Sequence, residues 1–345
     1  MIRENGPEQE KGKNILADQS KQINETKQKK EAHIHVAPSP HVSEPLMTTR
    51  RMMTDVLIAL LPLTGVAVYI FKWYAVKQLL ITITACLAAE IIFVRMRGRS
   101  FTLMDCSAAV TGVILALSLP GTAPWYVGVL AAFVAMGIGK IIFGGLGMNI
   151  FNPAMVGRAF VMIAFASVMG ASAYEMPGSV VDALSQATPL TALKQSSIGV
   201  PLSHLFWGTT NGSLGEVSAA ACLVGGLFLC FRKTASWQIS ASLIGTAAFI
   251  AGLVDLLGSY SGYFLFHHLF GGALLFGAFF IATDPVTSPL TVKGKIIFGA
   301  GTGFLVMVLR LFSGYPEGVM FAILLMNGVT PLINRWTIPR PTGEV

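Results

Sequence analysis

Long apolar runs separated by short polar connections dominate the chain from Asp55 onward. A helix needs about 20 apolar residues to cross the roughly 30 Å hydrocarbon core of a bilayer. Ten runs approach this length, so we predict an all-α polytopic membrane protein with about ten transmembrane helices. Their approximate ranges are 54–71, 78–94, 105–119, 124–143, 154–172, 214–231, 237–257, 262–281, 296–312 and 317–334.

The third run is short, and Pro120 and Pro124 follow it closely, which predicts a broken or half-crossing helix. Ten runs divide into two halves of five, and an odd number per half makes the second half inverted relative to the first. The hexapeptide Gly-Lys-Ile-Ile-Phe-Gly occurs at 139–144 and again at 294–299. This match has two interpretations, an internal duplication or a coincidence of apolar composition. A duplication would place a binding site where the halves meet.

The amino-terminal 45 residues are rich in Lys, Glu, Gln and Asn and poor in aromatic residues. They cannot bury enough apolar surface to fold alone, so we expect a disordered tail at 1–45 and no signal peptide. A transmembrane domain at 46–345 would follow. Lys and Arg gather in the tail and in alternate loops, whereas the opposite loops hold only Lys72, Lys77 and Lys194. The positive-inside rule therefore predicts an inner-membrane protein with both termini cytoplasmic.

The composition supports this class, with 53% hydrophobic residues, 12% charged residues and a mean hydropathy of +0.66. The net charge of +7 reflects the loop asymmetry, so we expect no nucleic-acid partner. The four cysteines lie in or beside apolar runs without a Cys-x-x-Cys pair, which predicts core residues and no metal site. His267 and His268 lie inside the eighth run, where they would serve either a proton path or neutral, hydrogen-bonded packing.

The polar segment from Gly144 to Arg158 opens the fifth predicted helix. Asn152 and Pro153 are typical of a helix start, with the asparagine as N-cap and the proline at the first helical position. This interpretation leaves Asn149 and Arg158 unexplained. An arginine almost two turns into an apolar helix is costly unless it finds an anion, a carbonyl or a route to the surface. Two amides and a guanidinium at a helix start would suit a planar, hydrogen-bonding ligand or a phosphate.

A second polar segment, 282–289, follows the eighth predicted helix on the cytoplasmic side. One interpretation is a proline-rich turn that closes the helix. In the other, Asp284 accepts a hydrogen bond from a ligand's ring nitrogen or hydroxyl, or forms part of a cation path. Few other carboxylates lie near the bilayer, namely Asp55, Glu90, Asp105 and Asp255. Of these, Glu90, Asp105 and Asp255, together with the His267-His268 pair, are candidates for an ion path.

The third polar segment is the external connection at about 172–213, the longest hydrophilic stretch after the tail. Loops of this length in compact bundles tend to be functional. It contains Asp182-Ala183-Leu184-Ser185-Gln186-Ala187-Thr188-Pro189-Leu190. A helix N-cap at Ser185 or Thr188 followed by Pro189 would explain its residue chemistry. The hydroxyl of Thr188 is also a place where a cofactor could be attached.

Together the three segments resemble the D subunits of Rnf ion-translocating electron-transport complexes and, more distantly, the B subunits of sodium-pumping NADH:quinone oxidoreductases. The resemblance runs from about Pro45 to Pro341 and rests on residues 147–158, 182–190 and 282–285. It implies that Thr188 carries FMN through a phosphoester formed by a separate flavin transferase, with Asp182 and Ser185 in the recognised pattern. The chain departs at Ala183 and Gln186 from the small residues, commonly glycine, that are usual there.

The resemblance also implies a second flavin, riboflavin, bound without a covalent bond toward the cytoplasmic side by Asn149, Asn152 and Asp284. Electrons from reduced ferredoxin would arrive through other Rnf subunits, pass through the FMN on the outer face and continue to NAD. The free energy released would drive Na⁺ or H⁺ across the membrane. Because the flavin carries the redox step, we expect no catalytic acid, base or nucleophile from this chain.

Residue chemistry alone leaves two other functions open. A stand-alone secondary transporter or channel for a small solute would share the ten spans, the inverted halves and the broken helices. A structural anchor for redox partners would bind no flavin. An esterified threonine outside the bilayer distinguishes the redox subunit, since a carrier has no need for one.

Overall fold

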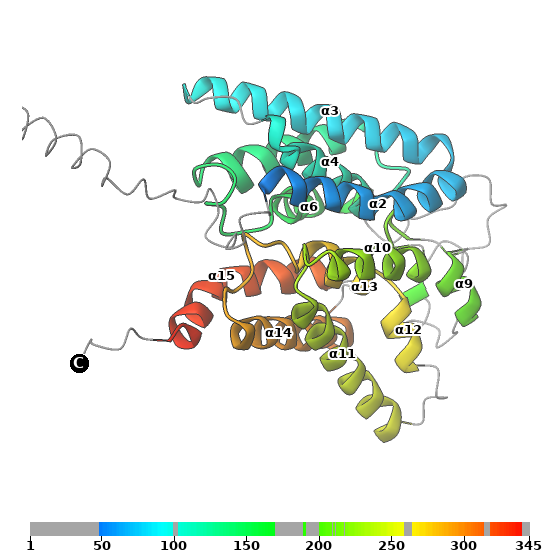
Figure 1. The fold of residues 1–345 in the computed structure, drawn as a ribbon. Helices are drawn as coiled ribbons and strands as arrows, with labels where there is room; N and C mark the ends of the chain where they lie inside the picture. Colours follow the sequence, from blue (N-terminus) through cyan, green and yellow to red (C-terminus); the bar gives the residue numbers. More distant parts are fainter. Residues whose placement is uncertain are drawn as a thin grey trace, which may run out of the picture. The chain divides into compact units, whose positions relative to one another are not determined.

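The computed structural model describes residues 48–98, 103–169, 189–190, 200–208, 210, 212–216, 218–258, 264–313 and 318–339. Within these ranges every regular element is a helix and no strand occurs, which confirms the predicted all-α class (Figure 1). The elements before residue 170 are α2 (Thr49–Phe71), α3 (Trp73–Met96), η1 (Leu103–Asp105), α4 (Ser107–Ser118), α5 (Trp125–Val134), η2 (Ala135–Ile141), α6 (Pro153–Ala164) and α7 (Ala166–Met169).

The elements of the second half begin after residue 200. They are α9 (Leu202–Trp207), α10 (Ala219–Phe231), α11 (Trp237–Leu257), α12 (Phe264–Phe270), α13 (Leu274–Phe276), η5 (Gly277–Ile281), α14 (Val292–Phe312) and α15 (Val319–Thr337). Both η2 and η5 are π-helical segments, one in each half. Wide turns of this kind are frequent at functional sites.

Each of the ten predicted runs contains a helix, but the helices differ in length. Five are long and apolar enough to cross a bilayer alone, namely α2, α3, α11, α14 and α15. The eighth run is one bent span, in which α12 and the α13–η5 pair meet at 52°. The other four runs form the shorter apolar helices α4, α5 with η2, α6 and α10.

The third run forms the half-crossing helix that the sequence predicts. α4 has 12 residues, of which 11 are buried, so it spans about 18 Å, well short of a bilayer core. The sixth run begins its helix only at Ala219 rather than at 214. The residues just before Ala219 form an unwound segment instead. In it, the backbone N–H of Leu214 donates to the carbonyl of Leu119, and that of Gly215 donates to the carbonyl of Leu117. The unwound segment therefore satisfies carbonyls at the end of α4 that lipid could not.

The hexapeptide match occupies different places in the two halves. Residues 139–144 close η2 and enter the following turn, whereas residues 294–299 belong to the first turns of α14. The match therefore does not mark equivalent positions, and the inversion of one half relative to the other stays a prediction.

Glycines allow the closest approaches between helices. A Cβ atom at Gly225 of α10 would lie 2.2 Å from the carbonyl oxygen of Ala59 on α2. On α14, a Cβ atom at Gly303 would lie 2.5 Å from the carbonyl oxygen of Leu243 on α11. Small residues at such crossings let membrane helices pack backbone to backbone. The first of these contacts joins the two halves, since α10 lies along α2 (Figure 1).

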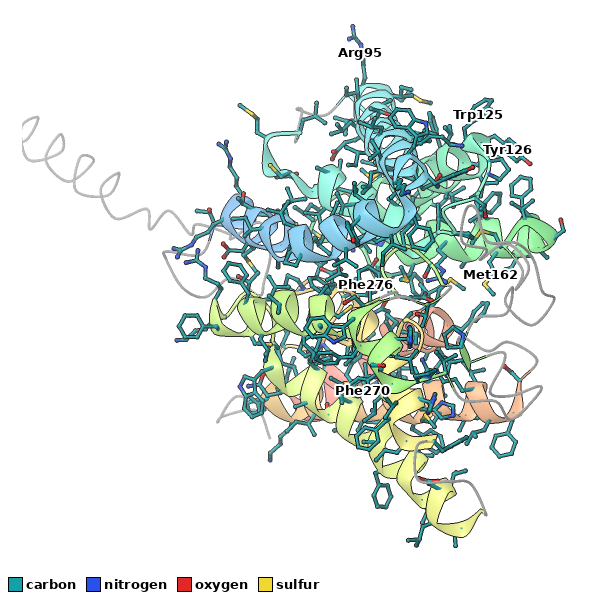
Figure 2. The ribbon with its side chains drawn as sticks, turned by 90° about the vertical axis from the view of Figure 1, so that its right-hand side faces the viewer. Arg95, Trp125, Tyr126, Met162, Phe270 and Phe276 are labelled. Atoms are coloured by element: carbon teal, nitrogen blue, oxygen red, sulfur yellow. The ribbon has the colours of Figure 1, made fainter. Side chains whose placement is uncertain are left out.

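All five tryptophans lie at or next to helix ends and are exposed. They are Trp73, Trp125, Trp207, Trp237 and Trp336, with 62–76% of their surface accessible. Trp125 and Tyr126 stand together at the start of α5, with ring centroids 6.1 Å apart (Figure 2). Tryptophan and tyrosine favour the level of the lipid headgroups, so this distribution is typical of helices that end at the bilayer surface.

The crossing of α11 and α14 predicts a selective effect of alanine substitution. We expect Gly303→Ala to destabilise the protein by about 1–3 kcal/mol, because the added methyl group overlaps the backbone of α11. Gly245→Ala on α11 is the control, since a Cβ atom there meets nothing within 4 Å. Thermal unfolding in detergent measures both variants. Equal melting temperatures for the two would contradict the close crossing.

Candidate functional site

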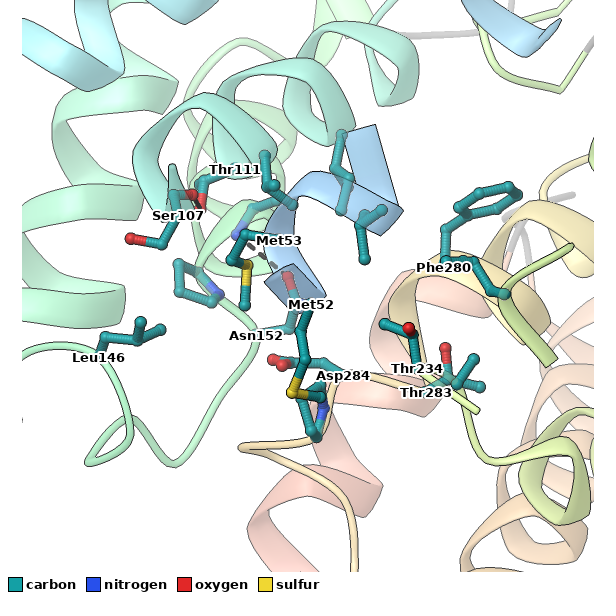
Figure 3. A pocket seen from close by; sticks show the side chains of 18 of the residues that line it. Met52, Met53, Ser107, Thr111, Leu146, Asn152, Thr234, Phe280, Thr283 and Asp284 are labelled. Carbon is teal, nitrogen blue, oxygen red and sulfur yellow. Dashed lines mark hydrogen bonds between the residues drawn. The ribbon is translucent and has the colours of Figure 1, made fainter. Parts of the chain in front are cut away.

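A cavity lies between the two halves, on the side where α2 begins and α10 ends. Its interior volume is about 70 Å³, and it opens to the outside through a wide mouth. Ser107, Asn152 and Asp284 lie around it (Figure 3). The polar lining residues are Ser107, Thr111, Lys140, Asn149, Asn152, Thr234, Thr283 and Asp284.

The rest of the lining is apolar. It includes Met52, Met53, Val56, Val110, Ile114, Leu229, Phe279 and Phe280. Both π-helical segments contribute, since Lys140 belongs to η2, and Phe279 and Phe280 belong to η5. A cavity with apolar walls and a few polar groups suits the faces and the edge of a planar ring.

Asn152 has the structural role that its sequence context predicts. Its side-chain oxygen accepts hydrogen bonds from the backbone N–H groups of Ala154 and Met155, at 3.1 and 3.3 Å, so it is the N-cap of α6. Its own backbone N–H donates to Oδ1 of Asn327 on α15, at 3.2 Å. No described residue accepts from the side-chain NH2 group of Asn152. This NH2 group of Asn152 could therefore donate hydrogen bonds to a ligand.

Asn149 has an acceptor that the described protein leaves open. The residue is only 5% exposed, and its side-chain NH2 group donates to the carbonyl of Phe151 at 3.2 Å. No donor among the described residues reaches its Oδ1 atom. A buried polar atom without a partner is destabilising and calls for an explanation, such as a ligand or a water molecule. Asn149 therefore fits a ligand that offers an N–H group.

Asp284 lies in the turn after η5 and lines the cavity. Its carboxylate accepts from the backbone N–H of Val286 at 3.3 Å and from the hydroxyl of Thr287 at 3.2 Å. Burial raises the pKa of this carboxyl from 3.8 to about 6, and the two hydrogen bonds act in the opposite direction. These contacts agree with the turn interpretation, and a ligand contact by Asp284 stays a prediction.

Lys140 is a lining residue that the sequence patterns did not identify as part of a site. Its ammonium lies 2.5 Å from Oε1 of Glu90 on α3 and 2.6 Å from the hydroxyl of Ser107 on α4. The side chains of Lys140 and Glu90 are 2% and 1% exposed. The hydroxyl of Ser107 in turn donates to Asp105 at 2.6 Å. A lysine inside an apolar run was the signal that could have identified it.

Arg158 does not line the cavity formed by Asn149, Asn152 and Asp284. Its guanidinium lies 3.5 Å from Oε1 of Glu216, in the unwound segment before α10, and both side chains are buried. A buried arginine needs an anion, a carbonyl or a route to the surface, and the carboxylate of Glu216 is such an anion. A cofactor contact by Arg158 stays a prediction.

Two other charged groups have structural partners. Asp55 of α2 accepts from Arg232, at 3.0 and 3.3 Å, and from Thr234 at 3.0 Å, which ties the start of α2 to the end of α10 beside the cavity. Arg310 of α14 donates to the carbonyls of His268 and Gly271, at 2.5 and 3.1 Å, where α12 breaks.

The other residues singled out from the sequence either lie in packed, structural positions or fall outside the described residues. The nitrogen Nε2 of His267 lies 2.7 Å from the carbonyl oxygen of Val200, which agrees with the packing interpretation. Cys86 and Cys222 are buried, free core residues, and no group of three His, Cys, Asp or Glu in the described ranges could hold a metal ion. Asp182, Ser185 and Thr188 lie outside the described residues.

The segment just after Thr188 is described at two positions, Pro189 and Leu190, which are both buried. Leu190 packs at the break between α12 and α13, because a Cβ atom added at Gly271 would lie 3.3 Å from its Cδ2 atom. The predicted attachment segment is therefore followed directly by a residue anchored in the second half.

Comparison with known proteins gives consistent matches along most of the chain. A sequence model of the NQR2, RnfD, RnfE family matches residues 35–343. The chain is 40% identical to the D subunit of the Na(+)-translocating ferredoxin:NAD(+) oxidoreductase complex of Acetobacterium woodii, over 91% of this chain and 96% of the relative.

Two further relatives have similar names. The chain is 39% identical to the D subunit of the proton-translocating ferredoxin:NAD(+) oxidoreductase complex of Clostridium ljungdahlii, over 89% of this chain and 96% of the relative. It is also 39% identical to the D subunit of the ion-translocating oxidoreductase complex of Halorhodospira halophila, over 88% of this chain and 94% of the relative.

The raised pKa of Asp284 predicts a pH dependence of stability. Between about pH 4 and 6 the folded state binds a proton at Asp284 more tightly than the unfolded state, so this contribution favours folding at low pH and is lost as the pH rises through 6. The free energy of unfolding of the wild type, relative to Asp284→Asn, should fall by on the order of 2 kcal/mol from pH 4 to pH 7. Thermal unfolding of both proteins in detergent tests this. A difference that stays constant with pH would contradict it.

Proposed function

The chain belongs to the NQR2, RnfD, RnfE family, and on this basis we propose that it is the D-type membrane subunit of an ion-translocating ferredoxin:NAD(+) oxidoreductase complex. The observation that carries this proposal is the match to three D subunits of ion-translocating oxidoreductase complexes, two of them named ferredoxin:NAD(+) oxidoreductases, over 88–91% of the chain and 94–96% of each relative. The activity belongs to the complex, because electrons reach this subunit from ferredoxin, and leave it toward NAD, only through partner subunits. The name of one relative specifies Na⁺ as the translocated ion, and the name of another specifies protons.

Two flavins would give this subunit its redox role. A flavin can take up and release single electrons, while the protein supplies position and electrostatic surroundings. We place FMN on the hydroxyl of Thr188, where a flavin transferase would form the phosphoester within the segment 182–190. A tether of this kind keeps the flavin on the outer face, where free FMN would diffuse away.

Riboflavin is proposed for the cavity between the halves. The open Oδ1 atom of Asn149 fits an N–H donor at the edge of the isoalloxazine ring. The NH2 group of Asn152 fits a ring carbonyl, and the carboxylate of Asp284 fits a further N–H or a ribityl hydroxyl. The apolar walls from α2, α4 and η5 suit the two faces of the ring.

Covalent attachment has a direct test in the denatured protein. The chain is produced with a flavin transferase and its partner subunits, separated on a denaturing gel and viewed under ultraviolet light. We expect a fluorescent band for the wild type and for Thr191→Val, a nearby threonine that serves as the control, and a dark band for Thr188→Val. The last variant should also abolish electron transfer from ferredoxin to NAD in the complex. A dark wild-type band would remove FMN from the proposal and favour a stand-alone transporter instead.

The cavity is tested by riboflavin binding to the full-length chain produced without a flavin transferase. Quenching of riboflavin fluorescence gives the dissociation constant in detergent. We expect Asn149→Leu to weaken binding at least tenfold, because about 1.4 kcal/mol is within the range for one lost hydrogen bond in a buried site. Met148→Leu is the control, since Met148 is 69% exposed and does not line the cavity. Equal affinity for both variants would contradict this placement.

A further inference from the structure

The ion pair of Lys140 and Glu90 carries a large desolvation cost in the wall of the cavity. Both side chains are almost fully buried between α3, α4 and η2, in the part of the chain that forms apolar runs. Removing two charges from water costs several kcal/mol for each, which their attraction offsets only with good geometry. Apolar residues of similar size would pack there at lower cost, so the pair calls for a functional explanation.

The geometry leaves one donor of Lys140 for the cavity. An ammonium group has three N–H donors. Glu90 and Ser107 accept two of them, at 2.5 and 2.6 Å, and no other described residue accepts the third. Lys140 and Ser107 both line the cavity. An acceptor atom at the edge of a bound ring would complete the coordination of the ammonium.

Two helix starts add positive character near Lys140. α4 and α6 begin at the cavity, since Ser107, Pro153 and Ala154 line it, and a helix start carries partial positive charge. The ammonium of Lys140 lines the cavity, whereas its counter-charge Glu90 does not. A ring edge that faces Lys140 would therefore lie closer to the ammonium than to the carboxylate of Glu90.

We propose that Lys140 is a positioning residue that favours the reduced form of the flavin in this cavity, and that Glu90 and Ser107 hold its ammonium in place. This inference rests on the riboflavin site proposed above. One-electron reduction by a redox centre of a partner protein would add one negative charge to a bound flavin, with no bond formed or broken. The ammonium of Lys140, which keeps its proton, would stabilise that charge and so raise the reduction potential of the flavin.

The two members of the pair should shift the potential in opposite directions. Lys140→Met removes the positive charge and should lower the ratio of reduced to oxidised riboflavin about tenfold at a fixed ambient potential, which is about 59 mV for one electron. Glu90→Gln removes the opposing negative charge and should raise that ratio. The double variant, which removes both charges of the pair, should lie between the wild type and Lys140→Met. A residue that only maintains packing would not produce this order.

The experiment uses the full-length chain in detergent, produced without a flavin transferase and loaded with riboflavin. Spectroelectrochemical titration gives the potential, and riboflavin fluorescence quenching gives the affinity for the oxidised form. Lys293→Met is the matched control, since Lys293 is an exposed lysine at the start of α14 that does not line the cavity. It should leave the potential unchanged.

The possible results separate the two proposals. If the wild type binds riboflavin and the potentials follow the expected order, Lys140 has the role proposed here. If riboflavin binds to the wild type and to all variants with one common potential, the role of Lys140 is wrong, while the riboflavin site stands. If the wild type binds no riboflavin, the site and the inference both fall. Should Lys140→Met not fold, the double variant and Glu90→Gln still give the two opposite comparisons with the wild type.

Discussion

Satisfaction of backbone polar groups inside the bilayer is the constraint on which the rest of this structure depends. Two helices stop within the apolar part of the chain, and at each break another segment supplies hydrogen-bond donors to the free carbonyls. Backbone N–H groups of the unwound segment before α10 pair with carbonyls at the end of α4, and Arg310 pairs with carbonyls at the break after α12. Lipid could offer no such partners. These closures allow short helices to begin and end beside a polar cavity in the interior.

The class of the fold follows from the sequence because apolar length is a direct physical requirement for crossing a bilayer. Element boundaries follow less well. The sixth run is apolar from residue 214, yet its helix begins at Ala219, because the carbonyls of Leu117 and Leu119 need donors. That need arises from contacts between segments about 100 residues apart, so no local pattern reveals it. The cap formed by Asn152 is local, and the sequence predicts it correctly.

The same distinction applies to the candidate site. Sequence patterns identify Asn149, Asn152 and Asp284, and the structure brings them together in one cavity. Lys140 escaped notice because a charge near the end of an apolar run usually reaches the surface. Only the fold shows that Glu90, 50 residues away, keeps it inside. A pair buried between three helices is a tertiary property, and no spacing along the chain encodes it.

The cavity also has a consequence for biosynthesis. Its walls come from residues as far apart as Met52 and Pro285, and Asn327 on α15 holds the backbone at Asn152. The first half is synthesised well before α15, so at that stage the cavity lacks its walls from the second half and the support of Asn327. A small molecule bound there would have to enter after translation is complete. Insertion of the last helix would then be the event that makes the nascent protein competent to take up its ligand.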